Sequence, residues 1–259
     1  MVSRYMKLLV TGGTGLLGSR LVPRLGAAGH QVQVMTHSGR KVVGAGSITG
    51  DLLTGQGVAE AVSGAECVIH LATSPGGDSN KVDVLGTKGL IEMARRAQVG
   101  HLIYVSIVGV DRIPYPYYKA KLAAEKLVQA GRVPWTILRA TQFYSYVDIL
   151  LKQAASRPVM VVPKGWKAQP VDAGEVSAKL QESVLAGPRE YLPHFGGPEI
   201  FTSEQLAQAW QAAHADHRPL LAVPWPTTAG RAFQKGHATC PDNRYGRITF
   251  TQWMAGARG

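Results

Sequence analysis

Cysteine, acidic residues and long apolar runs are scarce in this sequence, and each shortage excludes a class of protein. The two cysteines, Cys67 and Cys240, lie far apart and form no CxxC pair. Cys67 sits in the apolar run ECVIHLA, which indicates a small buried hydrophobe in a reducing compartment. No apolar stretch is long enough to span a bilayer, and the first residues, MVSRYMKLLV, contain no signal-peptide core with a cleavage site. We therefore expect a soluble, cytoplasmic protein without a membrane partner.

The shortage of acids leaves the chain strongly basic. Lys+Arg number 28 against 17 for Asp+Glu, which gives a formal net charge of +11. Such an excess suits nucleic acid, an anionic membrane or a phosphorylated cofactor. The basic residues, however, are scattered in short groups such as RRAQ, KGWK, KAKLAAEK and the final GARG, and no Lys/Arg run reaches five. This pattern favours a generally basic surface, and we expect no nucleic-acid partner.

The sequence does contain a regular alternation of strand-like and helical patterns over its first 140 residues. Short apolar or alternating runs predict strands over Lys7–Thr11, Gln31–Thr36, Ser47–Thr49, Cys67–Ala72, His101–Ser106 and Trp135–Arg139. Helices are expected within residues 16–29 and 53–64, over Val82–Ala97 and over Tyr117–Ala130. Strands that alternate with helices predict a parallel sheet joined by right-handed crossovers. The expected fold class is therefore α/β, a Rossmann-like doubly wound parallel sheet.

The pattern weakens after residue 142. A strand is expected over Val159–Val162, and helices over Tyr144–Ala155, within residues 171–187 and from an N-cap at Thr202 or Ser203. Prolines recur throughout this part of the chain. We therefore expect a dinucleotide-binding domain over residues 1–142. A smaller substrate-binding lobe over residues 143–259 is expected to complete that domain rather than to fold alone.

The motif TGGTGLLG (Thr11–Gly18) follows the first expected strand and opens the first expected helix. Its glycines are three residues apart, and their missing Cβ atoms allow a tight turn and the close approach of a pyrophosphate. The helix N-terminus adds free N–H groups and a partial positive charge for that anion. A purely structural turn is the alternative, but the strand–turn–helix context favours dinucleotide binding. The expected contacts are Gly12, Thr14, Gly15, Leu16, Leu17 and Gly18.

The end of the second expected strand carries no acid, which bears on the kind of dinucleotide. NAD sites usually place an Asp or Glu there to bind the ribose hydroxyls. Here the stretch is THSGRK, residues 36–41, whose hydroxyls, histidine and cations suit a 2′-phosphate that an acid would repel. An exposed polar loop is the alternative. We expect NADP(H) in preference to NAD(H), bound by Thr36, His37, Ser38 and Arg40.

The order of further motifs carries a resemblance. They are TGGTGLLG, GDLLT, VIHLA, VDVLGTKGLIEMA, LIYVSIVGVD, YYKAK, WTILRATQF, QPVDAGEVSAKL, GGPEIFTSEQLAQAW and TFTQWMA. In this order the chain resembles atypical short-chain dehydrogenase/reductase proteins of the NmrA-like kind over nearly its whole length. The resemblance implies that Asp51 and Leu52 border the adenine and that Leu71, Ala72 and Thr73 line the cofactor ribose and phosphate. It also implies that Ser106 and Ile107 lie near the nicotinamide, and that four residues close over it toward the substrate: Ala140, Thr141, Gln142 and Phe143.

The resemblance further gives a role to Tyr117 and Lys121, which match YxxxK spacing. In reductases of this superfamily the Lys cation lowers the Tyr pKa and holds the ribose, while the phenol passes a proton to a carbonyl oxygen as hydride arrives. The usual third member is a Ser or Thr after the fifth strand, often the second of a Ser–Ser pair. Here Ser106 is followed by Ile107. Tyr117, Lys121 and Ser106 are the expected catalytic residues, and a helix N-terminus with snorkelling side chains is the alternative.

Other combinations favour no metal site. His214 and His217 lie three residues apart without a supporting Cys, His or HExxH context, and His70 in the buried strand suits a satisfied core residue. The expected function is NADPH-dependent reduction of a small carbonyl, quinone or aromatic electrophile, with a small molecule as the main partner. The alternative is a non-catalytic NADP(H)-binding redox sensor with a regulatory protein partner, since the resembled family includes regulators. A homodimer is a further possibility in this superfamily.

Overall fold

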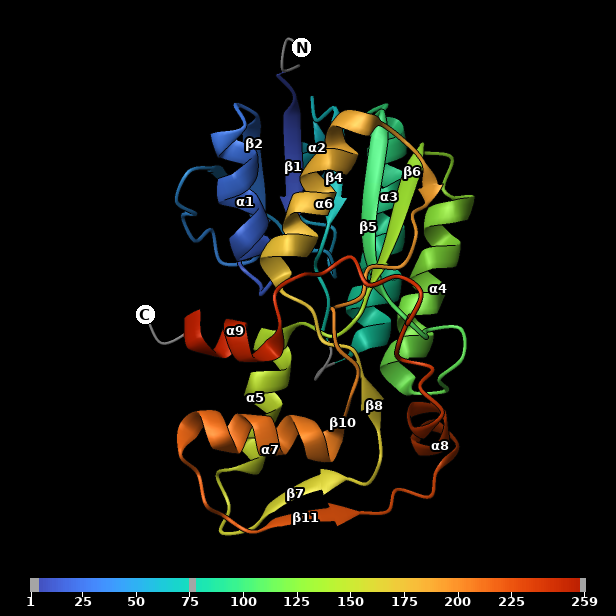
Figure 1. Ribbon diagram of the computed structural model, residues 1–259. Coiled ribbons are helices and arrows are strands. Elements are labelled where there is room, and N and C mark those ends of the chain that lie inside the picture. Colours follow the sequence, from blue (N-terminus) through green and yellow to red (C-terminus); the bar gives the residue numbers. More distant parts are fainter. Residues whose placement is uncertain (1–4, 75–77, 257–259) are drawn as a thin grey trace. The chain divides into compact units, whose positions relative to one another are not determined.

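Seven strands form a parallel sheet in the computed structural model, which describes residues 5–74 and 78–256 (Figure 1). The central strand β1 (Lys7–Thr11) pairs with β2 (Gln31–Thr36) on one side and β4 (Cys67–His70) on the other. The order β3-β2-β1-β4-β5-β6-β9 is completed by β3 (Gly46–Thr49), β5 (His101–Ile107), β6 (Trp135–Ala140) and β9 (Glu190–Tyr191). Because the order runs outward from β1 in both directions, the predicted doubly wound sheet is confirmed.

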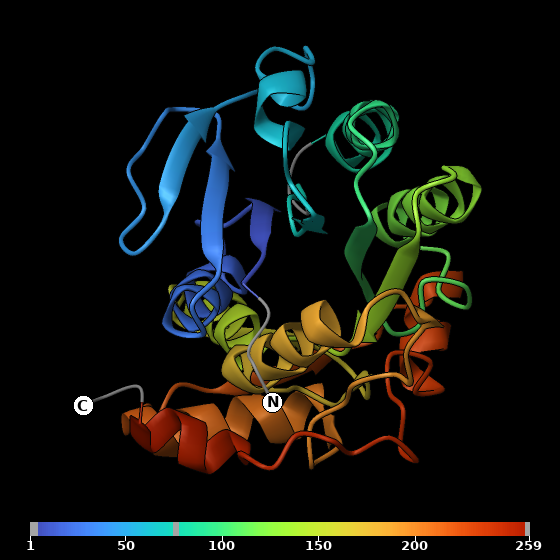
Figure 2. The same cartoon turned by 90° about the horizontal axis from the view of Figure 1, so that it is seen from above.

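Helices cover both faces of this sheet. On one face lie α1 (Gly18–Ala27) and α6 (Ala173–Ala186), and on the other lie α2 (Val58–Val62), α3 (Thr87–Arg96) and α4 (Pro116–Ala130) (Figure 2). The covering of both faces explains why several strands, among them β1 and β4, are apolar and buried almost throughout.

The core beneath α2, α3 and α4 is built from these apolar strands. Leu9, Val68 and Leu102 of the sheet are fully buried together with Leu90 of α3 and Val128 of α4. Each such side chain stabilises the fold by about 1.5–3 kcal/mol relative to an exposed one. The loops at the carboxyl ends of the strands are thereby carried by a rigid base.

A second hydrophobic core lies between three other helices, α5 (Tyr144–Ala154), α7 (Ser203–His214) and α9 (Phe250–Gly256). Tyr144, Trp210 and Phe250 are among its largest buried members. Two short ribbons accompany it: β7 (Met160–Pro163) pairs parallel with β11 (Leu220–Val223), and β8 (Lys167–Ala168) pairs antiparallel with β10 (Phe201–Thr202). The helix α8 (Thr228–Gln234) follows β11.

The chain forms two compact units, each assembled from three segments. The first unit contains residues 1–106, 119–138 and 176–192, and the second contains residues 107–118, 139–175 and 193–259. Residues 176–192 lie after the boundary expected at residue 142, yet they belong with the sheet because most of α6 covers it and β9 pairs with β6 at Thr136↔Glu190. The division into domains at residue 142 stays a prediction.

Several local details differ from the expected elements. The helix expected within residues 53–64 is limited to α2, because Gly55 and Gly57 adopt left-handed φ values of 78° and 71°. The helix expected over Val82–Ala97 begins as a π-helix, η1 (Asn80–Gly86), before α3. Thr202 is confirmed as the N-cap of α7 through a capping box with Gln205. The strands β8 to β11 and the helices α8 and α9 were not expected.

Two stretches considered in the sequence analysis extend beyond the residues that the structure describes. Residues 1–4 of MVSRYMKLLV and residues 257–259 of the final GARG lie outside the described residues. Within residues 5–74 and 78–256, no helix combines the length and the apolar character that crossing a membrane requires.

Candidate cofactor site

The Gly-rich turn after β1 is folded tightly against the segment that follows β4. Gly12 has a φ of +70°, and a Cβ placed there would lie 2.5 Å from the amide nitrogen of Ala72. A Cβ on Gly18 would lie 2.4 Å from the carbonyl oxygen of Gly12. The Gly15 N–H closes the turn by donating to that same oxygen at 3.0 Å. Both Gly12 and Gly18 therefore require glycine for steric reasons.

One side of the Gly-rich turn faces solvent, and the other side is buried in the fold. Thr14, Gly15 and Leu16 are exposed, whereas Leu17 and Gly18 are buried. No side chain of the described residues caps the start of α1, and its first turn holds no acid. The N–H groups of Ser19 and Arg20 already donate to the carbonyl oxygens of Gly15 and Leu17. The positive end of the α1 dipole nevertheless lies at the open turn, where it favours an anion such as a pyrophosphate.

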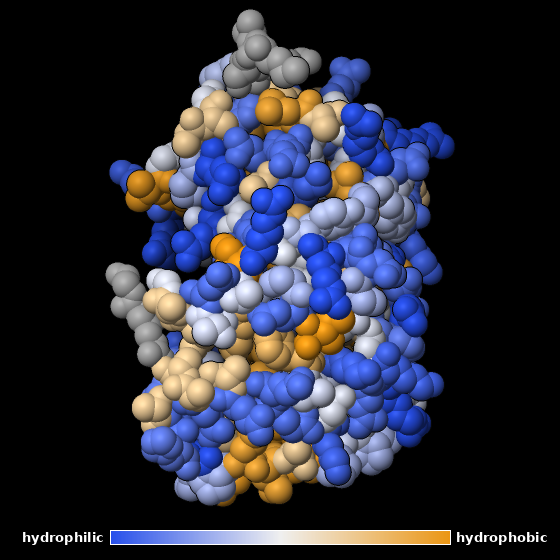
Figure 3. Space-filling model, in the orientation of Figure 1, coloured by the Kyte–Doolittle hydropathy of each residue, from blue (hydrophilic) through white to orange (hydrophobic). Residues whose placement is uncertain are grey.

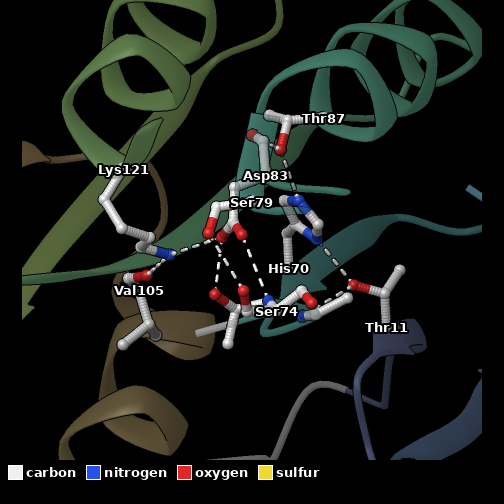
Figure 4. A network of polar contacts seen from close by, with 10 residues as sticks. Thr11, His70, Ser74, Ser79, Asp83, Thr87, Val105 and Lys121 are labelled. Carbon is white, nitrogen blue, oxygen red and sulfur yellow. Dashed lines mark hydrogen bonds and ion pairs between the residues drawn. The ribbon is translucent and has the colours of Figure 1, made fainter. Parts of the chain in front are cut away.

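A buried chain of hydrogen bonds ties this turn to α3 (Figure 4). Thr11 Oγ1 lies 2.6 Å from Nδ1 of His70, and Nε2 of His70 lies 2.8 Å from Oγ1 of Thr87. The Thr87 hydroxyl donates its own proton to the carbonyl oxygen of Asp83 at 2.7 Å, so it accepts from His70, which is protonated on Nε2. Burial and the nearby Lys121 cation lower the pKa of His70 to about 3, which keeps the ring neutral. The expected satisfied core histidine is confirmed.

Asp83 holds the segment after β4 in place from inside the π-helix η1 (Figure 4). The residue is 1% exposed. Its Oδ1 accepts from Thr73 Oγ1 at 2.5 Å, and its Oδ2 accepts from the Ser74 N–H at 3.1 Å. A buried carboxylate is costly unless it is hydrogen-bonded and paired with a cation. The two donors meet the first condition, and Lys121 meets the second.

Lys121 reaches Asp83 from α4. Its Nζ lies 3.8 Å from Asp83 Oδ1, donates to the carbonyl oxygen of Val105 at 2.8 Å and lies 4.2 Å from the centroid of the Tyr104 ring. Burial lowers the pKa of Lys121 to about 8, although the carboxylates of Asp83 and Glu125 raise it. The ammonium group is therefore mostly charged at pH 7, and with three N–H donors it retains one for a ligand hydroxyl.

The loop after β2 places basic and hydroxyl groups beside β3. Thr36 is buried at the end of β2, and its Oγ1 has no hydrogen-bond partner among the described residues. His37 is 82% exposed, and its Nε2 lies 3.8 Å from Oδ2 of Asp51. The Asp51 carboxylate is also held by the Leu53 N–H at 2.8 Å. Arg40 is exposed and makes no ion pair within the part of the chain that the structure describes. The loop offers cations and hydroxyls, with Asp51 next to His37.

The remaining expected residues are distributed over both compact units. Ser106 is 2% exposed on β5, and its buried Oγ has no hydrogen-bond partner among residues 5–74 and 78–256. Tyr117 opens α4 one turn before Lys121 and is half-buried, with its ring centroid 6.3 Å from that of Tyr118. The boundary between the units falls between residues 118 and 119.

The segment expected to close over the nicotinamide belongs to the second unit. Ala140 ends β6, and the Thr141 hydroxyl donates to the carbonyl oxygen of Gln169 at 2.5 Å. Gln142 and Phe143 are half-buried, and Phe143 is the N-cap residue of α5. The set predicted from the sequence is therefore split. The turn, residues 71–73 and Lys121 come together in the first unit, whereas residues 140–143 lie in the second.

Sequence reasoning missed Asp83 and Tyr104, which frame the Lys121 ammonium group. A signal for Asp83 was present: it is the one acid in the apolar run VDVLG of an expected helix. Among the described residues, no group of three or more His, Cys, Asp or Glu side chains is placed to hold a metal ion. The fit of the first unit to a dinucleotide rests on the steric cradle at Gly12 and Gly18 and on the buried cation.

The residues of this site fall within the match to a known protein family. The model of the NAD(P)H-binding family matches residues 12–149, more than half of the chain. That range begins in the Gly-rich turn and includes η1, the YxxxK helix and residues 140–143.

Two curated proteins illustrate the similarity. The chain is 36% identical over 153 residues to the 2-alkyl-3-oxoalkanoate reductase of Stenotrophomonas maltophilia (strain K279a), covering 49% of this chain and 46% of that protein. It is 32% identical over 148 residues to photosystem II assembly factor Ycf39 of Trieres chinensis, covering 54% of this chain and 46% of that protein. The chain thus spans about half the length of the curated relatives it matches.

A solved structure supports the fold over nearly the whole chain. An NADPH-dependent quinone oxidoreductase of Escherichia coli, crystallised with NADPH, matches with a TM-score of 0.78 at 15% identity, covering 97% of this chain and 100% of that one. Similarity at this level of identity concerns the fold alone.

Proposed function

We propose that this chain, which belongs to the NAD(P)H-binding family and is an atypical short-chain dehydrogenase/reductase of the NmrA-like kind, reduces a small carbonyl, quinone or aromatic electrophile with NADPH. The observation that carries the proposal is the Lys121 ammonium group. It is buried in the first unit and positioned by Val105, Tyr104 and Asp83. A fixed buried cation beside a glycine cradle fits a cofactor ribose.

NADPH, when bound, supplies the hydride. The Gly12–Gly18 turn and the N-terminus of α1 would hold its pyrophosphate, and Lys121 would donate to the ribose hydroxyls. Asp83 keeps the ammonium group oriented through its contact at 3.8 Å, and it orders residues 73 and 74 beside the turn. These groups bind and orient the cofactor without taking part in the transfer itself.

Tyr117 would be the acid of the reaction. It precedes Lys121 by one turn of the same helix, and a neighbouring cation favours the ionised phenol and so lowers its pKa. As hydride reaches the carbonyl carbon, the phenol would give its proton to the carbonyl oxygen, and solvent would then return a proton to the phenolate. Ser106 would add a hydroxyl donor to the developing oxyanion. For a quinone acceptor, solvent can supply the protons.

NADPH is proposed in preference to NADH. Thr36, Ser38 and Arg40 would contact the 2′-phosphate, because Arg40 makes no ion pair within the described residues and the Thr36 hydroxyl is unpartnered there. The carboxylate of Asp51 is occupied by the Leu53 and Thr54 donors and lies beside His37. An acid engaged in this way repels a nearby phosphate less than a free one.

The comparisons support a reductase without fixing its substrate. One relative is named as a reductase of 2-alkyl-3-oxoalkanoates, and one structural neighbour is named as a quinone oxidoreductase. Both names describe reduction of a conjugated or activated carbonyl. They therefore define the two substrate classes to be tried first.

The test is NADPH oxidation with a panel of 3-oxo acids, ketones and quinones, followed at the nicotinamide absorbance band. We expect turnover of at least one class, and a loss of about 10²-fold or more in Lys121→Met. The matched control is Lys126→Met, which removes an exposed lysine from the same helix and should leave the rate unchanged. A panel without any NADPH oxidation, or equal rates in the two variants, would contradict the proposal.

A redox sensor is the second candidate, and Ser106 is the observation that favours it. Its side chain is 2% exposed and Ile107 follows it, so the reacting carbonyl has one assured donor fewer. A protein that binds NADPH without oxidising it, and that retains a regulatory partner only in the presence of one redox form, would support this function.

We further propose that the protein works in the cytoplasm with both thiols reduced. Cys67 and Cys240 are free and buried, and burial raises the pKa of each thiol. A buried protonated thiol reacts slowly with oxidants. Fractionation of the source cells would test the location.

A further inference from the structure

Aromatic side chains from four separate segments meet in the second compact unit. Tyr115, Tyr117 and Tyr118 lie at or before the start of α4, Trp166 lies between β7 and β8, Trp225 follows β11, and Phe233 belongs to α8. We call these six residues the aromatic array. None of them is a member of the described core cluster around Tyr144 and Phe250. The array therefore needs an explanation other than membership of that core.

The rings of the array contact one another in a continuous series. Tyr118 makes an edge contact with Phe233, with centroids 5.8 Å apart, and Phe233 stacks on Trp166 at 4.4 Å with an interplanar angle of 15°. Trp166 in turn lies 5.7 Å from Trp225. Tyr118 is buried, with 6% of its surface exposed, Phe233 and Trp166 are half-buried, and Trp225 at the other end is 51% exposed. Solvent-facing rings that lead to buried ones suit a ligand-binding surface.

Two buried polar atoms of this region lack partners within the described chain. They are Oε1 of Gln142 and Nε1 of Trp166. The Gln142 side chain hydrogen-bonds to Tyr118, and burial raises the pKa of Tyr118 to about 12, so the phenol stays protonated. Native proteins rarely leave buried polar atoms unpaired, and exceptions call for a ligand or another specific explanation. One atom is an acceptor and the other is a donor.

We infer that the aromatic array binds a flat aromatic ring that carries a hydroxyl group and a second oxygen. The hydroxyl would donate to Oε1 of Gln142, the second oxygen would accept from Nε1 of Trp166, and the ring would pack on Phe233 and Tyr118. Offset-stacked and edge-to-face aromatic contacts add specificity to the apolar burial. The inference rests on the proposed function only in taking the bound ring to be the hydride acceptor, a hydroxylated quinone or aryl carbonyl.

The experiment uses calorimetric titration with 2-naphthol, which NADPH cannot reduce, and with 2-methoxynaphthalene, which lacks the hydroxyl donor. We expect the wild-type protein to bind 2-naphthol about five- to tenfold more tightly, the effect of one hydrogen bond. Gln142→Leu should abolish that preference. Trp166→Phe, which keeps an aromatic ring, should weaken the binding of both probes. Trp135→Phe is the matched control, because Trp135 contacts Tyr191 in the first unit, and it should change nothing.

Circular dichroism on each variant separates unfolding from lost binding. The inference is overturned if 2-naphthol does not bind, or if folded Gln142→Leu keeps the preference for it. NADPH titration and oxidation on the same preparations keep this result apart from the proposed function. NADPH oxidation without 2-naphthol binding overturns the inference alone, whereas 2-naphthol binding without any NADPH binding supports the array and contradicts the reductase.

Discussion

Two clusters of buried polar side chains, one in each compact unit, differ in how far their hydrogen bonds are made within the described chain. Around Lys121 in the first unit, Thr11, His70, Asp83 and Thr87 are joined in one network of hydrogen bonds and ion pairs. In the second unit, the aromatic array leaves an acceptor on Gln142 and a donor on Trp166 unpaired within the described chain. The first cluster is held together by contacts among its own members and keeps one Lys121 N–H for a ligand, whereas the second would be completed only by a ligand.

Apolar side chains also lie on the surface of the second unit. The view in Figure 3 is largely hydrophilic, with separate apolar patches that include one near the ribbon of β7 and β11, where Val161 and Leu221 are 45% and 53% exposed. Val161 and Leu221 lie opposite each other on the outer face of the ribbon, while Met160 and Val162 are buried in the core. Scattered apolar surface of this kind is normal for a folded protein.

The largest expected effect comes from filling the cradle with Gly12→Ala. The new Cβ would meet the backbone of Ala72 at 2.5 Å, so we expect NADPH affinity to fall by at least about 100-fold and stability by about 1–3 kcal/mol. Gly29→Ala is the control, since Gly29 also has a positive φ, +87°, but nothing lies within 4 Å of its Cβ. It should cost about 1–2 kcal/mol of stability and leave NADPH affinity intact. Calorimetry measures the NADPH affinity of both variants, and urea unfolding measures their stability. If Gly12→Ala bound NADPH as tightly as the wild-type protein, the proposed role of the Gly12–Gly18 turn in binding the cofactor would be wrong.

The next effect concerns the choice of cofactor. Arg40→Glu replaces the proposed phosphate contact with a charge that repels it. We expect NADPH to bind about 10–100-fold more weakly, as for the loss of a charge-assisted hydrogen bond, while NADH affinity stays the same. Lys126→Glu makes the same charge change on the exposed face of α4 and serves as the control. If the two variants weaken NADPH binding equally, the effect is one of net charge and the proposed 2′-phosphate site is wrong.

A smaller effect follows from the pKa of Lys121. With a pKa of about 8 in the folded protein, the ammonium group loses its proton above pH 8, so NADPH affinity should fall there. Stability should change in the opposite direction: between about pH 8 and pH 10.5 the unfolded lysine still binds a proton that the folded one has lost, so this group makes unfolding less favourable as pH rises.

Asp83→Asn sharpens this pH prediction. Without the carboxylate that raises the pKa of Lys121, that pKa should fall further, and the loss of NADPH affinity should begin at a lower pH. Asp78→Asn removes an exposed carboxylate that pairs with Lys81 and should leave the profile unchanged. Titrations of NADPH across pH measure the midpoint. An unchanged midpoint in folded Asp83→Asn would mean that Asp83 does not control Lys121.

The smallest effect is confined to the second unit. Thr202→Ala removes the hydrogen bond that the Thr202 hydroxyl accepts from the Gln205 N–H in the capping box of α7, and leaves the bond from the Thr202 N–H to Oε1 of Gln205. We expect a loss of about 1 kcal/mol of stability. NADPH affinity should not change, because no part of the capping box belongs to the first unit. Urea unfolding and calorimetry check the two outcomes. A large loss of NADPH affinity would show that the units are more strongly coupled than the comparison above implies.

The sequence predicted much of the first unit because its signals are local. Each strand from β1 to β6 lies in a short apolar or alternating run, and the Gly12–Gly18 turn is a contiguous motif. The π-helix and Asp83 were missed, because seven residues of π-helix that lead directly into α3 are too few to change the apolar pattern of the expected helix. The contacts of Asp83 with Thr73 and Lys121 join residues 10 and 38 positions apart, and no periodicity reports such distances.

The second unit was less predictable for the opposite reason. β8 and β10 are two residues long, too short to produce a pattern. The aromatic array comes from four segments without a common spacing, so its sequence shows only isolated aromatics. Thr202 is the exception, because its capping box with Gln205 is a local motif.

The most direct test of hydride transfer uses NADPH deuterated at both C4 positions of the nicotinamide. The carbonyl substrate is the one that is consumed fastest in the panel, and the product is analysed by mass spectrometry. The proposed function predicts one deuterium on the former carbonyl carbon of the product, and little product from Lys121→Met. NADPH that binds tightly while no deuterium appears in any product would contradict the reductase and favour the sensor.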